Sequence, residues 1–357
     1  MVHLVKNTKS EGEGSFREAL ELSNADATRA HVIRFALPEA EAVIRPKDPF
    51  PEVKASVEID GSVDLDRRPS VTIDGNDAGQ ASGLTLAGPP PSTIRGLFIT
   101  GFKGSGVVLH GEGTHLVERC AIYDSSDRGV IVTSDHCVLR MLEVCGNSNG
   151  GIIVVGAKGA RIQGCRIGVT CTGEEHGNGT SGVYIAQAPG NSIGPENTIS
   201  GNHHYGVLIY GSKSRENHVF GNLIGTDPQG NSAIPNLRTG VLIFNAPDNV
   251  IGGIRSDSRK IISGNRRNGI NIDGSATRPE LDGGNPDKFT EQGGCGFAIG
   301  NTVCGNFVGT DLSGTTALPN GKHGILIFVA QGNFVGGASP GHANVISGNK
   351  EHGIFVL

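Results

Sequence analysis

The chain has 357 residues and a formal net charge of −5, which argues against a nucleic-acid partner, because phosphates require clustered Lys and Arg. Its 56 glycines do not follow the three-residue period of collagen, and its apolar runs recur too regularly for a disordered chain. No apolar run approaches the roughly 18 residues of a membrane span, so we expect no membrane partner either. We therefore expect a single elongated repeat domain over residues 1–357, which agrees with this length, composition and charge.

The N-terminal segment is expected to start the fold and to close one end of it. Ser15 and Glu18 have the spacing of a capping box, which predicts a short helix from Ser15 to Leu22 with one apolar face. Because a solenoid exposes its core at each end, this helix is interpreted as a cap. The cap and irregular first coils occupy residues 1–82, with strands expected at 2–5, 32–37, 57–61 and 71–75.

From residue 83 to 357 a glycine followed by an apolar-x-apolar strand recurs along the chain. The basal interval of about 22 residues suits a coil of three short strands and three turns, with insertions confined to corners. We therefore predict roughly ten or more coils, stacked as parallel strands about 4.8 Å apart. The glycines that open these strands are Gly83, Gly106, Gly129, Gly151, Gly182, Gly206, Gly240, Gly269, Gly324 and Gly353.

Asparagine and aspartate mark the corners between the predicted strands. Asn202 and Asn265 follow equivalent Ile-Ser-Gly runs, where we expect left-handed backbone and hydrogen bonds to neighbouring residues. Asn222, Asn306 and Asn349 occupy similar corners. Asp227 and Asp311 both end a Gly-Thr-Asp run, and this repetition favours a structural turn over a unique active site.

The segment Gly12-Glu13-Gly14-Ser15-Phe16-Arg17-Glu18-Ala19 resembles a Gly-x-Gly-Ser-Leu-Arg-x-Ala element, with Phe16 in place of leucine. This element is typical of a secreted bacterial branch of the right-handed parallel β-helix proteins, the pectin-lyase-like superfold. The Gly-Asn-x-Ile-Gly-Thr-Asp and Ile-Ser-Gly-Asn coils are similar to that branch as well. The resemblance implies an all-β, right-handed parallel β-helix and a secreted or cell-surface location. It leaves the function open, because β-helices host lyases, hydrolases, epimerases, adhesins and carbohydrate-binding modules.

The outward positions of the predicted strands are apolar and partly aromatic. The first and third residues after each glycine are expected to fill the core, so the second and fourth face outward. Soluble proteins rarely leave such a strip bare, so it should meet a ligand, a partner or a loop of the chain itself. Sugar rings stack on Tyr and Phe, which favours an extended glycan, although the absence of Trp weakens this interpretation. The strip comprises Tyr184, Leu208, Tyr210, Leu242, Phe244, Leu326 and Phe328.

The strip is interrupted where the longest insertion begins, at residues 275–294. This insertion is more polar than any coil, and a loop of this length is usually functional, although a decoration without function stays the alternative. We expect its polar side chains, and those that precede it, to hold the hydroxyls of the glycan. These residues are Asn271, Asp273, Arg278, Glu280 and Asp282.

Catalytic candidates are weak, and the best are Asp124, Asp127 and Arg128. Hydrolases need paired carboxylates, and lyases need an acidic calcium site beside a basic residue. Asp is an ordinary turn residue, so a corner is the simpler interpretation of both aspartates. The run from Glu174 to His176 could bind a metal, but a solvated loop is the favoured interpretation. No cofactor is therefore expected, with calcium added if the protein is a lyase.

The seven cysteines include no Cys-x-x-Cys pair, so the sequence signals neither a zinc site nor a complete disulfide framework. Apolar neighbours favour buried free thiols at Cys120, Cys145, Cys165 and Cys304. A disulfide between Cys165 and Cys171 stays open as an alternative.

These patterns favour a non-catalytic polysaccharide-binding module, for a plant cell-wall glycan such as xylan or pectin. A polysaccharide lyase or glycoside hydrolase on the same fold is the first alternative, and product analysis discriminates it. An adhesin or structural segment of a surface protein is the second alternative. Because the sequence ends within the apolar run 353–357, we also expect further domains of a larger protein or self-association through the C-terminal end.

Overall fold

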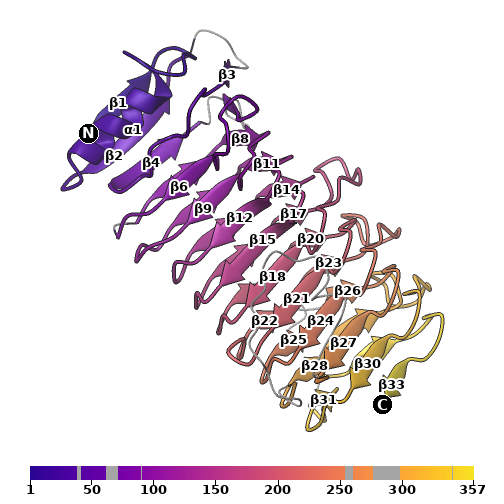
Figure 1. Cartoon of the computed structure of the whole chain (residues 1–357). Coiled ribbons are helices and arrows are strands. Elements are labelled where there is room, and N and C mark those ends of the chain that lie inside the picture. Colours follow the sequence, from indigo (N-terminus) through magenta and orange to yellow (C-terminus); the bar gives the residue numbers. More distant parts are fainter. Residues whose placement is uncertain (38–41, 62–70, 90, 254–259, 276–297, 340) are drawn as a thin grey trace.

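The computed structural model describes residues 1–37, 42–61, 71–89, 91–253, 260–275, 298–339 and 341–357. Over these residues the chain forms a parallel β-helix, as the repeats predict. Figure 1 shows the coils stacked in a single row, which starts beside helix α1 (Phe16–Ala25) and ends at strand β33 (Ile354–Val356). Each regular coil contributes one strand to each of three sheets, called A, B and C below.

Neighbouring strands within each sheet pair in parallel, as β21 does with β24. Sheet A contains, in spatial order, β1 (Val2–Val5), β2 (Ala30–Phe35), β4 (Ser56–Asp60), β7 (Thr93–Arg95), β10 (Leu116–Glu118), β13 (Val138–Arg140), β16 (Arg161–Gln163), β19 (Ser192–Ile193), β22 (His218–Val219), β25 (Val250–Gly252), β28 (Thr302–Cys304) and β31 (Phe334–Val335). Sheet B contains β3 (Ala42–Ile44), β5 (Val71–Asp74), β8 (Leu97–Thr100), β11 (Ala121–Tyr123), β14 (Glu143–Cys145), β17 (Arg166–Ile167), β20 (Thr198–Ile199), β23 (Leu223–Ile224), β26 (Lys260–Ile262), β29 (Asn306–Val308) and β32 (Val345–Ile346). Sheet C contains β6 (Leu84–Leu86), β9 (Val107–Leu109), β12 (Arg128–Val132), β15 (Gly150–Val155), β18 (Val183–Ala186), β21 (Val207–Tyr210), β24 (Val241–Phe244), β27 (Ile270–Asp273), β30 (Ile325–Phe328) and β33.

The register of sheet C confirms which residues of the repeats are equivalent. Ile209 pairs with Ile243, and both side chains are fully buried in the main hydrophobic core. The glycine before each strand lies against the next coil: a Cβ on Gly206 would stand 2.6 Å from the carbonyl oxygen of Gly240. Close stacking of the coils therefore excludes a side chain at the repeated glycine, and the residues after it alternate between core and outer face.

Buried asparagines form a ladder at one corner of the coils. The Asn202 side chain donates to Oδ1 of Asn236 at 3.0 Å, and Asn236 donates both to Oδ1 of Asn265 and to the backbone oxygen of Ile199. The predicted hydrogen bonds are thus confirmed. The predicted corner asparagines, such as Asn202, do not use the left-handed backbone that this residue type tolerates, because the preceding glycine, such as Gly201 with φ of 73°, takes that conformation. The ladder consists of Asn147, Asn178, Asn202, Asn236, Asn265, Asn320 and Asn349.

The aspartates of the two Gly-Thr-Asp runs are turn residues, as predicted. Oδ1 of Asp227 accepts hydrogen bonds from the backbone N–H groups of Gln229 and Asn231. Oδ1 of Asp311 accepts in the same way from Thr316 at 3.2 Å. Each carboxylate therefore closes its own loop and leaves no sign of a shared catalytic role.

Helix α1 covers the N-terminal end of the core. Oγ of Ser15 accepts the backbone N–H of Glu18 at 3.1 Å, and the Glu18 carboxylate accepts the backbone N–H of Gly14 at 2.6 Å. Phe16 and Leu20 are fully buried in the main core. The predicted capping helix is confirmed, except that it continues to Ala25 instead of ending at Leu22.

The cysteines that the structure describes are free thiols. The expected burial of Cys120, Cys145, Cys165 and Cys304 is confirmed. The alternative disulfide between Cys165 and Cys171 is wrong, because Cys165 packs inside the core whereas Cys171 is exposed. Burial raises the pKa of the Cys165 thiol to about 12, so this group stays protonated and unreactive. None of the helices among the described residues is long and apolar enough to cross a membrane.

Candidate functional site

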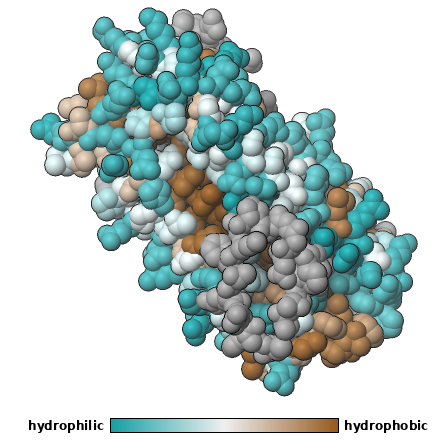
Figure 2. All heavy atoms as spheres, viewed as in Figure 1, coloured by the Kyte–Doolittle hydropathy of each residue, from teal (hydrophilic) through white to brown (hydrophobic). Residues whose placement is uncertain are grey.

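The outer face of sheet C carries the predicted strip as two adjacent columns. Figure 1 shows this sheet along the side turned towards the viewer, and Figure 2 shows apolar residues exposed on that side. The strand register places one residue of each column on consecutive coils. The first column contains Tyr184, Leu208, Leu242, Asn271 and Leu326, and the second contains Tyr210, Phe244, Asp273 and Phe328.

The centre of this strip is a second hydrophobic cluster, separate from the main core. Leu208, Leu242 and Phe244 are at most 4% exposed, and they pack with Tyr205, which the sequence analysis did not include. The ring of Tyr210 stacks on Phe244 with 5.7 Å between centroids. The strip therefore faces away from the core, as predicted, but its centre is buried and contributes packing energy of its own. Truncation of Phe244 consequently removes buried volume, contrary to the expectation for a bare surface residue.

Asn271 is the most unusual polar residue on this face. Its side chain is fully buried between Leu242 and Leu326 in the first column, and neither its oxygen nor its nitrogen has a hydrogen-bond partner among the residues that the structure describes. Asp273, two residues on, accepts the backbone N–H of Ser275 at 2.9 Å. Leaving a buried amide unpaired costs about 1 to 3 kcal/mol for each group, so such a side chain calls for an explanation.

Basic residues form a column along one border of the strip, two positions before the strand glycines. The backbone N–H of Arg267 donates to the oxygen of Arg238 at 3.0 Å, and that of Lys322 donates to Arg267 at 2.9 Å. His204 precedes this cationic column and Glu351 follows it in the same pattern. Arg267 and Lys322 are exposed, and within the described residues their side chains make no hydrogen bond or ion pair. The sequence analysis missed this column, although a basic residue stands two before the glycine in three successive repeats.

A small cavity of about 150 Å³ lies where the strip meets the cationic column. Its lining includes Tyr205 of the second cluster, Leu326 of the strip, Arg267 and Lys322 of the column, and His323. This volume accommodates about five water molecules. It therefore suits a polar group that projects from a larger ligand lying on the surface.

The weak catalytic candidates each have a structural partner. Asp127 accepts from Ser105 at 2.6 Å and from Asn149 at 3.1 Å, and it forms an ion pair with Arg128. Burial disfavours its charged form, but these hydrogen bonds outweigh burial and hold the pKa of Asp127 below its usual range. Asp124, whose φ of 51° marks a turn, pairs instead with His176 at 2.9 Å. The two aspartates thus lie in the same turn, between β11 and β12, and each has a structural partner of its own.

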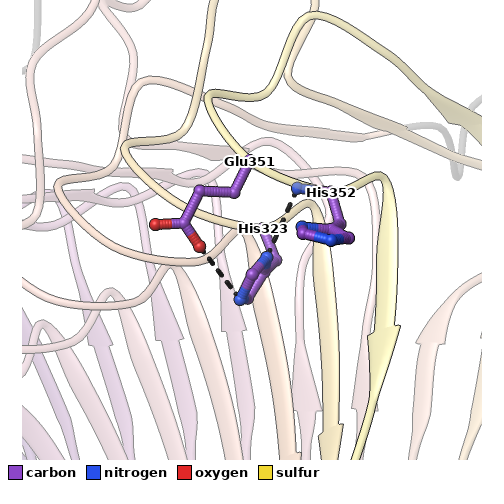
Figure 3. Close-up of side chains that lie close together, drawn as sticks. All are labelled: His323, Glu351 and His352. Atoms are coloured by element: carbon purple, nitrogen blue, oxygen red, sulfur yellow. Dashed lines mark hydrogen bonds and ion pairs between the residues drawn. The ribbon is translucent and has the colours of Figure 1, made fainter.

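One group of potential metal ligands converges among the described residues, and the sequence analysis missed it. His323, Glu351 and His352 bring one ligand atom each to within 4.8 Å of one another (Figure 3). Burial lowers the pKa of His323, while Glu351 opposes this effect. The signal in the sequence was the repeated His-Gly-Ile at residues 323–325 and 352–354. By contrast, the run from Glu174 to His176 does not converge in this way.

The remaining predicted ligand-binding residues, Arg278, Glu280 and Asp282, lie outside the described residues. Their proposed role stays a prediction. The site that the structure describes therefore consists of the strip with Asn271 and Asp273, the cationic column and the cavity between them.

Comparisons with known proteins agree with this fold. Residues 82–230 match the family model described as right handed beta helix region, and no curated protein matches the chain in sequence.

Among solved structures, the A-module of a mannuronan C-5 epimerase from Azotobacter vinelandii has a TM-score of 0.60 and 14% identity, covering 98% of this chain and 92% of that one. The Dettilon tailspike protein has a TM-score of 0.55 and 16% identity, covering 99% and 68%. A periplasmic alginate epimerase has a TM-score of 0.50 and 14% identity, covering 93% and 72%. At these identities the likeness shows the fold, and the chain is a parallel β-helix.

Proposed function

We propose that the chain binds an acidic polysaccharide along the outer face of sheet C, between the strip and the cationic column. The observation that carries this proposal is the exposure of Arg267 and Lys322, on consecutive coils and without partners among the described residues, beside the strip, whose Tyr184 and Tyr210 are only partly buried. Apolar and aromatic side chains suit the faces of sugar rings, and cations suit carboxylates. The combination favours an acidic glycan such as pectin over a neutral one such as xylan.

The spacing of the coils supports this choice of ligand. Consecutive strands of a sheet lie about 4.8 Å apart, which is close to the length of one sugar residue in an extended glycan. Stacked cations at this interval match the repeated carboxylates of a polyuronate. Two of the structurally similar proteins are epimerases named for mannuronan and alginate, which favours the same class of glycan without carrying their activity over.

The polar residues of the site have distinct expected roles. The amide of Asn271 has a donor and an acceptor without partners among the described residues, which suit the hydroxyls of a sugar once the neighbouring side chains move apart to admit it. Arg267 and Lys322 line the cavity of about 150 Å³, where a carboxylate of the glycan would contact both charges.

Binding should be weak to moderate, because sugars exchange hydrogen bonds to water for hydrogen bonds to protein. It should weaken further as salt screens the exposed charges. Such a ligand implies a secreted or cell-surface location.

The test is calorimetric titration of the full chain with polygalacturonate, alginate and neutral xylan. We expect the acidic glycans to bind, and the Arg267→Gln/Lys322→Gln double variant to lose about two- to thirtyfold in affinity, since exposed ion pairs contribute about 0.2 to 1 kcal/mol each. A matched control is Lys103→Gln/Arg161→Gln, which removes two exposed cations elsewhere. Equal affinity for xylan and polygalacturonate, or equal losses in both double variants, would contradict the acidic ligand.

The aromatic part of the site needs its own variant. Tyr210→Ala/Phe244→Ala removes the stacked pair and should weaken the binding of every glycan, acidic or neutral. Because Phe244 is buried, circular dichroism must show that the variant keeps its fold. Unchanged binding by a folded double variant would place the site elsewhere.

One observation favours a polysaccharide lyase as the second candidate. Abstraction of a proton beside a carboxylate requires a cation on that carboxylate, a base and an acid. The cavity collects Arg267 and Lys322 with the titratable groups of His323 and Tyr205. A hydrolase would need two carboxylates, and the described lining of the cavity includes none. Release of unsaturated sugars from polygalacturonate or alginate, followed by ultraviolet absorbance, would replace the binding function with the lyase.

A further inference from the structure

The last two coils of the described chain place two histidines at the same position. His323 precedes Gly324 and His352 precedes Gly353, each at the start of a strand of sheet C. The backbone N–H of Gly324 donates to the oxygen of His352 at 2.9 Å, so one residue stacks directly on the other. The centroids of the two imidazole rings are 5.2 Å apart. The repeat itself therefore brings two imidazoles together.

A carboxylate completes this group. Oε2 of Glu351 lies 3.1 Å from Nε2 of His323, as Figure 3 shows. The ring of Phe355 packs on both imidazoles, with centroid distances of 4.7 Å to His323 and 4.9 Å to His352. This apolar wall limits water on one side of the rings and restricts their orientation. One ligand atom from each polar residue lies within 4.8 Å of the others.

We propose that His323, Glu351 and His352 bind a divalent transition metal ion, with Zn²⁺ as the reference metal. Two imidazoles and one carboxylate form a donor set that suits Zn²⁺ and its neighbours, whereas Ca²⁺ and Mg²⁺ prefer oxygen ligands. Bonds of about 2.0 to 2.2 Å in a tetrahedral site separate ligand atoms by about 3.4 Å. The pair of His323 and Glu351 already has nearly this separation. The exposed His352 ring has to move by a small rotation to join them.

Metal binding exchanges existing hydrogen bonds for coordination. Nδ1 of His323 accepts the backbone N–H of His352 at 3.3 Å, which leaves a proton on Nε2, towards Glu351. When the metal takes Nε2, that proton moves to Nδ1, and the long bond from His352 is lost. The loss falls on the buried ring of His323 and the backbone of the exposed His352. The amide of His352 thus becomes a direct reporter of metal binding.

Nearby charges act in two directions. Lys322 and Arg267 repel a cation, but both are exposed, so salt screens their effect, and Glu351 offsets one charge. Three protein ligands leave a fourth position for water or for an anionic group. His323 also lines the cavity beside Arg267 and Lys322, so an anion held there would lie near the metal. The metal site itself does not depend on the proposed glycan.

The test is calorimetric titration of the full chain with Zn²⁺ alone, with Ca²⁺ and Mg²⁺ as comparisons. We expect one Zn²⁺ per chain and no comparable binding of the other two ions. His352→Ala and Glu351→Gln should each weaken Zn²⁺ binding about tenfold or more, since each removes one ligand. His203→Ala removes an exposed imidazole from another coil and should leave the affinity unchanged.

Two further measurements keep the test decisive. Substitution of Co²⁺ should give the visible absorption of a low-coordinate site, and the amide resonance of His352 should shift during titration with Zn²⁺. Circular dichroism confirms that each variant is folded. The proposal fails if the parent takes up no Zn²⁺ at millimolar concentration. It fails equally if a folded His352→Ala variant binds Zn²⁺ as tightly as the parent.

Discussion

Asn202 and Asn271 are both buried asparagines of the same β-helix, yet they are opposite in their hydrogen bonding. Asn202 donates to Asn236 and to the backbone oxygens of Ile167 and Ser200. Asn271 is equally buried but forms no side-chain hydrogen bond with any part of the chain that the structure describes. The first satisfies its polar groups inside the fold, whereas the polar groups of the second have no partner among the described residues and call for an explanation.

The position of each residue in the repeat explains the difference. Asn202 belongs to a ladder in which the same residue type recurs on consecutive coils, so each amide meets the next. Asn271 replaces the leucine found at Leu208, Leu242 and Leu326, so its neighbours in the column have nothing polar to offer. Repetition of a polar residue is therefore evidence of a structural role. A single polar residue in an apolar column lacks that structural role, which is why we propose Asn271 as part of the binding site.

The largest effect is expected from breaking the ladder. Asn202→Leu removes four hydrogen bonds of this side chain, to the backbone oxygens of Ile167 and Ser200 and to the side chains of Asn178 and Asn236. At about 0.5 to 1.5 kcal/mol for each lost hydrogen bond, the free energy of unfolding should fall by about 2 to 6 kcal/mol. Urea denaturation followed by circular dichroism measures this loss. A midpoint equal to that of the parent would show that the ladder is not a source of stability.

A pH-dependent effect of about half that size is expected from His115, another buried group with an unpaired atom. Its Nε2 has no hydrogen-bond partner in the described part of the chain, and burial lowers the pKa of the ring from 6.5 to about 4. As the pH falls from 6.5 to 4, the imidazole of His115 binds a proton in the unfolded chain but stays neutral in the folded chain. The free energy of unfolding therefore falls by about 3 kcal/mol across this window and is unaffected above it.

The His115→Gln variant isolates this contribution. Its free energy of unfolding should depend less on pH between 4 and 6.5 than that of the parent, whatever its stability at neutral pH. His136→Gln, which removes an exposed imidazole, is the control and should keep the slope of the parent. Identical slopes in parent and His115→Gln would mean that the ring is protonated in the folded state as readily as in the unfolded one.

The smallest effect should have the opposite sign. Asn271→Leu restores the leucine of the column and removes two unpaired buried atoms, so the free energy of unfolding should rise by about 1 kcal/mol. The same variant should bind acidic glycans more weakly in calorimetric titration. Gain of stability with loss of binding is the result that separates Asn271 from the ladder. A loss of stability similar to that of Asn202→Leu would instead make Asn271 a structural residue.

The architecture was predictable because it follows from local repetition. A glycine that fits against the next coil, aliphatic residues at alternate positions and polar corners already specify stacked parallel strands. Gly206 with Ile209 illustrates this, since each meets its counterpart one coil away by register alone. The capping helix was predictable for the same local reason, through Ser15 and Glu18.

The candidate site was only partly predictable. The strip of outward residues followed from the repeat, but its burial as a second cluster with Tyr205 did not, because Tyr205 belongs to a turn and not to a strand. The cationic column and the three converging ligands also lie before the strands. Residues there do not alternate between core and outer face as strand residues do, so the repeat does not predict where their side chains lie. Their positions depend on how the turns stack.

The sequence by itself determined the β-helix, its cap and the two faces of sheet C, because these depend on residues a fixed interval apart. The tertiary structure decided which polar side chains have partners and which do not. A sequence pattern cannot distinguish Asn202 from Asn271, because both are asparagines. His323 and His352 are 29 residues apart along the chain, and only the fold brings them together. Hydrogen bonding, burial and convergence are properties of neighbours in space, and only the stacked coils supply those neighbours.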